Sequence, residues 1–161
     1  MLEWLESTQA SVWIRSDIFG WPLALTLHAL GTALVVGLII IIGLRLLGLF
    51  ESIPYASLNR LFPIFWAALA LQFVSGFVLW MTKATRYVAD IAFVLKFGLI
   101  IIGVVLTYQF AETMKREAAS WDAKGAISSR ALTYVSAILA LWCIVLIAGR
   151  LTGYLGALYN G

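Results

Sequence analysis

The sequence predicts an all-α membrane protein, a four-transmembrane-helix bundle with a short N-terminal interfacial helix. Of its 161 residues, 63% are hydrophobic and only 12% are charged, whereas about 25% of the residues of a soluble domain are charged. Uncharged runs of more than about 18 residues are typical of membrane spans, and two of them, 18–44 and 61–82, are uninterrupted. Continuous apolar runs such as 35–42 lack the alternation of barrel strands. Helices, which satisfy their own backbone in lipid, are therefore expected.

The first element expected is a short helix over residues 2–16, lying at the outer membrane surface. Its apolar residues can share one face; they are Leu2, Leu5, Val12 and Trp13. A frayed terminus is the alternative. The first span, 18–44, and the second, 61–82, each carry a proline, Pro22 and Pro63, near the start. Proline is acceptable in a first helical turn because its missing N–H has no partner there.

The third and fourth spans each contain one basic residue. The third, 88–111, contains Lys96, and the fourth, 131–158, contains Arg150. The polar stretch 112–130 is expected to extend the third helix and then to turn near Gly125. The spans account for most of residues 1–161, so we expect a single membrane domain.

The basic residues predict an orientation rather than a nucleic-acid partner, although the isoelectric point is about 9.2. They are spread over the ends of the spans, which is typical of topology signals. The connections 45–60 and 112–130 hold Arg45, Arg60, Lys115, Arg116, Lys124 and Arg130, whereas the opposite side holds Arg15, Lys83 and Arg86. We therefore expect both connections in the cytoplasm of a bacterium and both termini on the outer side of its inner membrane.

Soluble-enzyme motifs are absent from the sequence. It has no Gly-rich phosphate loop, no H-E-x-x-H and no nucleophile elbow, so no catalytic residue is nominated. Its single cysteine, Cys143, excludes the Cys-x-x-Cys-His motif of covalently attached c-type haem. Apart from Asp90, near the start of 88–111, the spans carry no carboxylate, which argues against a proton relay through acids.

Three basic or proton-binding side chains lie inside the spans: His28, which is the only histidine, Lys96 and Arg150. Such groups are expensive in a bilayer and usually mark a site. From the helical rise, Lys96 and Arg150 lie ~12 Å below the outer ends of their spans, and His28 lies roughly 15 Å below its own. The three side chains are therefore expected in one layer, which Gln72 and Ser75 of the second span can also reach.

The ligand that uses this whole layer is haem b. A neutral imidazole is an axial ligand of haem iron, so His28 is the candidate metal ligand. Lys96 and Arg150 would pair with the propionates, and Ser75 completes the candidate cofactor-binding set. The second axial ligand is open: it is Lys96, Met81, a second chain's His28 or none. A quinone or an anionic lipid head group would use only some of these residues.

Each of these residues also has a structural interpretation. His28 can hydrogen-bond across helices, Lys96 and Arg150 can extend to the interface, and Arg150 can bind backbone carbonyls. The functional hypotheses are haem-b electron transfer or tetrapyrrole chemistry, a non-enzymatic accessory subunit of a membrane complex, and a small transporter. The absence of Met-rich or multi-His sets argues against a metal transporter. Expected partners are membrane lipids and either further copies of the chain or a larger complex.

Four segments carry a resemblance to a family of small four-span bacterial membrane proteins. They are His28-Ala29-Leu30-Gly31, Leu44-Arg45-Leu46-Leu47-Gly48, Ser75-Gly76 and Ala92-Phe93-Val94-Leu95-Lys96, within roughly residues 20–110. More distantly, a histidine in span one and a lysine in span three resemble the four-helix membrane protoporphyrinogen oxidases, which bind haem, and the copper-resistance membrane domains. This resemblance implies that His28 and Lys96 form the haem or substrate site. The chain departs from it in having no second histidine and in placing His28 deep in its first span.

Overall fold

The computed structural model describes residues 2–158, with side chains from 2 to 149, and contains no strand within that range. Four helices are long and apolar enough to cross a membrane: Gly20–Leu46, Tyr55–Met81, Ile91–Lys124 and Ser129–Gly149. The predicted fold class, an all-α four-helix membrane bundle, is confirmed. The protein is therefore a multi-pass membrane protein.

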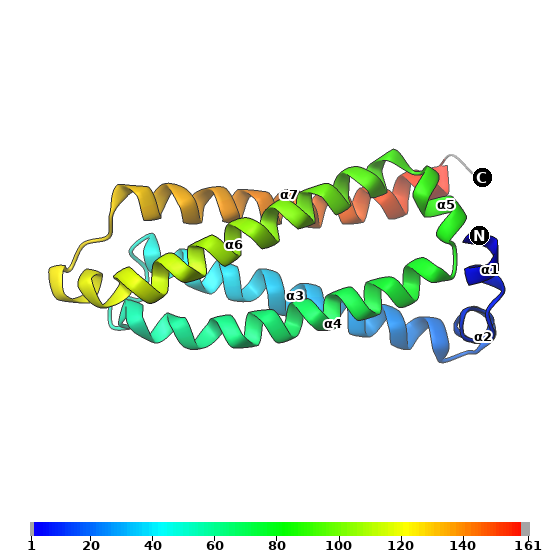
Figure 1. Cartoon of the computed structure of the whole chain (residues 1–161), viewed down its shortest axis with the longest axis horizontal. Coiled ribbons are helices and arrows are strands. Elements are labelled where there is room, and N and C mark those ends of the chain that lie inside the picture. The colour runs from blue at the N-terminus through cyan, green and yellow to red at the C-terminus, as the bar shows by residue number, and fades with distance from the viewer. Residues whose placement is uncertain (1, 159–161) are drawn as a thin grey trace.

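The four long helices form two antiparallel hairpins (Figure 1). Helix α3 (Gly20–Leu46) packs against α4 (Leu61–Met81), and α6 (Ile91–Lys124) packs against α7 (Ser129–Leu158). Contacts between α3 and α7 join the hairpins. The short helices α1 (Leu2–Ser7), α2 (Gln9–Ser16) and α5 (Ala84–Ala89) lie at one end, and the 3₁₀ helix η1 (Tyr55–Arg60) lies at the other, against α6.

Burial divides the bundle into two halves. The continuous core occupies 35–46 of α3, 62–69 of α4, 110–121 of α6 and 131–145 of α7, and we call this region the packed half. Ring contacts join the hairpins there: Phe62 with Phe110, Phe65 with Trp142, and Trp66 with Tyr108. The other half of the four long helices lies next to α1 and α2, and we call it the open half. In its part of α6, no residue from 91 to 102 is buried.

Arg45 lies at the end of the packed half, next to the connection between α3 and η1. The sequence placed Arg45 in the connection, but it lies in the last turn of α3 and is 6% exposed. Its guanidinium donates hydrogen bonds to the carbonyl oxygens of Ile53 and Glu51 and to the Tyr55 hydroxyl, and it stacks 3.9 Å from the centre of the Tyr55 ring. A buried guanidinium needs such partners, so Arg45 fixes the α3–η1 connection.

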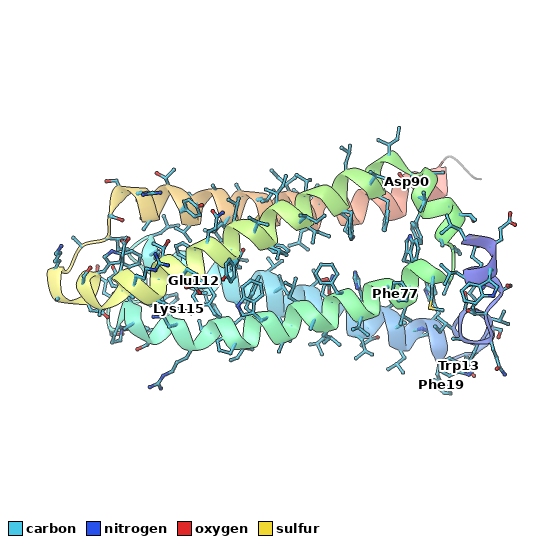
Figure 2. The ribbon with its side chains drawn as sticks, viewed as in Figure 1. Trp13, Phe19, Phe77, Asp90, Glu112 and Lys115 are labelled. Atoms are coloured by element: carbon cyan, nitrogen blue, oxygen red, sulfur yellow. The ribbon has the colours of Figure 1, made fainter. Side chains whose placement is uncertain are left out.

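The N-terminal segment is two helices rather than the predicted one. Thr8 interrupts it in an extended conformation, and its hydroxyl oxygen accepts a hydrogen bond from the Ser11 backbone N–H. Threonine is a preferred N-cap because it satisfies an unpaired helix donor. The two helices lie across the end of the bundle, where Trp13 and Phe19 are 53% and 73% exposed (Figure 2).

Helix boundaries differ from the predicted spans where caps or turns intervene. Helix α3 begins at Gly20 rather than Ile18, and α6 begins at Ile91 rather than 88 because the Asp90 carboxylate accepts from the Ala92 N–H. The predicted outer loop 83–90 contains α5. Helix α6 continues to Lys124 and ends at Gly125, whose positive φ of 65° is the left-handed cap that glycine adopts readily.

Candidate functional site

His28 lies in the open half and bridges α3 to α4. Its Nδ1 is 3.1 Å from the Ser75 hydroxyl oxygen, and its Nε2 is 3.0 Å from the Gln72 amide nitrogen. The same amide nitrogen donates to the Thr32 hydroxyl oxygen at 2.8 Å. His28 and Thr32 lie one turn apart on α3, and Gln72 and Ser75 lie one turn apart on α4, which is why four side chains meet in one layer. We call these four residues the polar layer.

The hydrogen bonds of Ser75 determine which ring nitrogen carries the proton. The Ser75 hydroxyl donates to the Leu71 carbonyl oxygen at 2.7 Å, so it accepts from Nδ1–H of His28. Nε2 then carries the lone pair and accepts from the Gln72 amide. A histidine whose Nδ1–H is held by a protein oxygen presents Nε2 in the form that binds metals.

Glycines on the facing helices leave room for the side chains of His28 and Lys96. A Cβ on Gly76 would lie 3.0 Å from Cε1 of His28, and a Cβ on Gly149 would lie 3.1 Å from Nζ of Lys96. Lys96 reaches from α6 across to α7. The structure therefore brings His28, Ser75 and Lys96 into one half of the bundle.

Lys96 is half-buried, and within the described residues no hydrogen bond or ion pair satisfies its amino group. The Gln72 side-chain oxygen is buried and likewise has no hydrogen-bond partner there. Buried polar groups are normally satisfied. The Gln72 oxygen faces Gly31 in the close contact between α3 and α4, so the unpaired amino group of Lys96 is the feature expected of a ligand site.

The remaining predicted site residue is Arg150. Its backbone belongs to α7, one residue beyond Gly149, but its side chain lies outside the described side chains. Its contacts with the polar layer therefore stay a prediction.

Gln72, Thr32, Gly76 and Gly149 have larger roles than the sequence indicated. Gln72 was expected only to reach the layer, yet it contacts both His28 and Thr32. The signal was the spacing of Gln72 and Ser75 inside an otherwise apolar span. Nothing in the sequence pairs Gly149 with Lys96, because 53 positions separate them and only the packing of α6 on α7 brings them together.

The described side chains contain no group of three or more His, Cys, Asp or Glu residues that would hold a metal ion unaided. A site for a metal cofactor would therefore depend on His28 and on ligands from the cofactor itself. Comparisons with family models, curated proteins and solved structures find no match to this chain.

Proposed function

We propose that the protein is an integral membrane haem-b-binding protein that acts in electron transfer or tetrapyrrole-related redox chemistry. The observation that carries the proposal is that His28 and an unpaired Lys96 are both half-buried in the same half of the bundle, where no residue of α6 from 91 to 102 is buried. A ligand with a metal centre and anionic groups matches both side chains.

The donor set fits haem b on three points. Nε2 of His28 carries a lone pair, while Ser75 holds Nδ1–H and so orients the ring. Lys96 offers a cation for a propionate, and Arg150 would offer a second. Bound haem b would supply a one-electron iron couple whose potential depends on its axial ligands and surroundings. The Gln72 amide donates a hydrogen bond to Nε2 in this structure. When haem binds, that hydrogen bond would break, and the amide would turn toward the ligand.

The identity of a second iron ligand would decide whether one chain or two chains hold the haem. Because the chain has one histidine, a six-coordinate iron requires Lys96, Met81 or the His28 of another copy. A haem shared by two copies would give half a haem per chain. We further propose that the protein lies in a bacterial inner membrane with both termini outside, since basic residues are concentrated at the end holding η1 and the α6–α7 connection.

The test of the proposal is a reduced-minus-oxidised visible spectrum of protein purified in detergent after expression with added haem, with a pyridine haemochrome assay. A b-type signal near one haem per chain supports a monomeric site, and about half supports a shared one. His28→Ala is expected to abolish the signal without changing the elution volume. Wild-type protein without a haem signal would overturn the proposal.

Two glycine pairs provide matched variants. Gly149→Ala crowds Lys96 and Gly76→Ala crowds His28, whereas Gly98→Ala and Gly37→Ala add a methyl group where nothing lies within 4 Å. We expect the first pair to lower haem occupancy and the second to leave it unchanged. Lys96→Met and Arg150→Leu should also lower occupancy, and unchanged occupancy in both would remove the propionate role.

A second candidate function has its own supporting observation. Both ring nitrogens of His28 have protein partners, as expected if the polar layer only joins α3 to α4. The protein would then be a non-catalytic accessory subunit of a larger membrane complex. This alternative predicts colourless protein, stoichiometric co-purification with large partners, and a His28→Ala variant that loses stability rather than pigment.

A further inference from the structure

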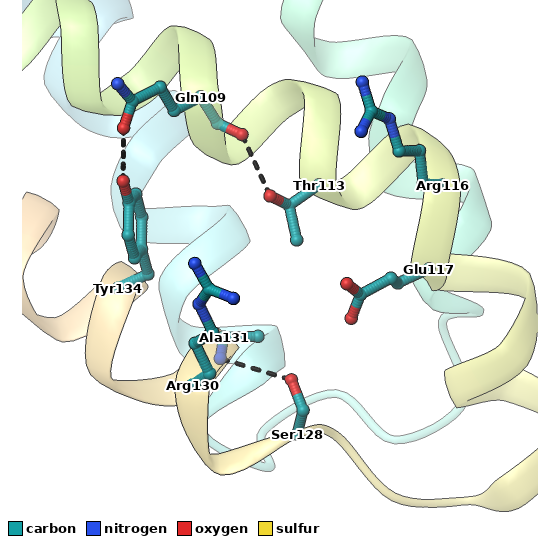
Figure 3. Close-up of a pocket in the computed structure, with 8 residues that line it drawn as sticks. All are labelled: Gln109, Thr113, Arg116, Glu117, Ser128, Arg130, Ala131 and Tyr134. Carbon is teal, nitrogen blue, oxygen red and sulfur yellow. Dashed lines mark hydrogen bonds between the residues drawn. The ribbon is translucent and has the colours of Figure 1, made fainter.

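A cavity of about 300 Å³ lies between α6 and α7 at the end of the bundle opposite the N-terminal helices. Figure 3 shows its lining: Arg116 and Glu117 come from consecutive positions on α6, and Arg130 lies near the start of α7. The proposed function uses none of these residues. We infer that this cavity binds the phosphate group of an anionic membrane lipid.

The charge of the lining matches a phosphodiester. Arg116 and Arg130 contribute two positive charges and Glu117 contributes one negative charge, which leaves a net charge of +1. Within the described residues, neither guanidinium has a hydrogen bond or ion pair with another residue. Both arginine side chains are exposed to the cavity opening. Arginine binds phosphate through paired, charge-assisted hydrogen bonds, so two guanidinium groups on one cavity favour an anionic phosphate group over a neutral ligand.

Two neutral polar side chains, Ser128 and Gln109, also line the cavity. The Ser128 hydroxyl oxygen accepts from the Ala131 N–H, which leaves its own hydrogen for a ligand. Gln109 accepts the Tyr134 hydroxyl through its side-chain oxygen, and its amide nitrogen remains a donor. Phosphate oxygens accept several hydrogen bonds at once, so these donors add to the two arginines.

The position of the cavity along the helix axes, at the level of the lipid head groups, favours a lipid over a soluble phosphate. Arg116 lies five residues beyond Ala111, where the apolar part of α6 ends, or about 7–8 Å further along the axis. Head groups extend roughly 5–8 Å beyond the hydrocarbon core on each side. The contact between Tyr134 and Gln109 lies on the side of the cavity that is nearer the apolar segments. Basic pockets between membrane helices are suited to anionic head groups at this level.

The experiment is native mass spectrometry of the full-length protein in detergent, titrated with phosphatidylglycerol, with phosphatidylcholine, or with glycerol 3-phosphate. We expect phosphatidylglycerol to be retained about tenfold better than phosphatidylcholine, with the preference lost in Arg116→Gln/Arg130→Gln. The matched control Arg60→Gln/Lys124→Gln removes the same charge from the same end, outside the cavity, and should keep the preference. Arg116→Lys/Arg130→Lys should retain part of it.

The titrations separate the two sources of phosphate. Glycerol 3-phosphate that displaces the lipid, or binds as tightly as it does, would show a phosphate site without lipid selectivity and would overturn the lipid assignment. Equal losses in the cavity variant and in the charge-matched control would reduce the binding to general charge attraction and would overturn the site. Unchanged elution volumes of all variants confirm that lost binding does not reflect unfolding.

Discussion

The two halves of this bundle are built from similar apolar helices, yet only one of them has a continuous core. In the packed half, Phe65, Met114 and Ile138 are each 0% exposed, and aromatic rings cross between the hairpins. In the open half, the inward-facing His28 and Lys96 stay half-buried.

The difference shows what holds helices together in lipid. Because lipid tails are as apolar as leucine, hydrophobicity alone does not drive two spans together; shape-matched packing and hydrogen bonds do. Edge-to-face rings supply such packing in one half. In the other half, α3 and α4 are joined by the polar layer. A ligand between the hairpins would provide the contacts that the side chains there lack.

The largest effect should come from breaking the ring contacts of the packed half. Phe65→Ala removes a fully buried ring that contacts both Trp66 and Trp142, and it should destabilise the protein by roughly 3 kcal/mol. Phe73→Ala, on the same helix but 44% exposed, should cost within about 0.5 kcal/mol. Unfolding titrations in mixed micelles measure both, and similar losses would contradict the division into halves.

A smaller effect is expected from separating α3 and α4 in the open half. A Cβ on Gly31 would lie 3.2 Å from the Gln72 Cα and backbone N, and 2.7 Å from its side-chain oxygen. Backbone atoms cannot rotate away, so Gly31→Ala should cost about 1–3 kcal/mol. Gly37→Ala meets open space and should be neutral or stabilising by up to about 1 kcal/mol. The same titration compares the two, and a neutral Gly31→Ala would argue against close helix approach at the polar layer.

An intermediate loss of stability, about 1 kcal/mol, is expected where Asp122 of α6 holds η1 at the end of the packed half. The two Asp122 carboxylate oxygens accept the N–H groups of Tyr55 and Ala56 at 2.7 and 3.0 Å. Asp122→Asn keeps only one acceptor and should cost about 1 kcal/mol, with faster amide exchange at Tyr55 and Ala56. Glu112→Gln removes the exposed Glu112–Lys115 ion pair (Figure 2) and should change stability by less than about 0.5 kcal/mol. Unchanged exchange in Asp122→Asn would exclude the carboxylate as the anchor of η1.

The smallest effect concerns the contact between α1 and α5 next to the open half. The Glu6 carboxylate accepts from the hydroxyl and backbone N–H of Thr85, and these hydrogen bonds hold the pKa of Glu6 below its ordinary value of 4.5. A lowered folded-state pKa means that the contact is fully formed above pH 4.5 and is lost as the pH falls through the lower value. The Thr85 amide resonance should therefore titrate in acid, whereas Glu6→Gln should remove the titration. A Thr85 shift that persists in Glu6→Gln would assign it to another group.

Sequence reasoning reached part of the candidate site. It selected His28 and Lys96 because a polar group in an apolar run is conspicuous, and helical rise gave these two similar depths, at a level that Ser75 was expected to reach. It did not reveal that Gln72 contacts Nε2 of His28 or that Gly149 adjoins Lys96. Depth follows from position along one helix, whereas contact depends on the rotation of two helices about their axes, which an all-apolar span leaves undetermined.

The sequence by itself determined the fold class, the four membrane-spanning helices and the turn at Gly125, because the apolar length of a span and the cap residues are local properties. Only the tertiary structure decided that the hairpins pack tightly in one half and loosely in the other, and that Arg45 is buried at the connection. Those outcomes depend on which side chains meet across helices. In a chain whose spans are apolar on every side, the pattern of residues does not specify the faces that meet.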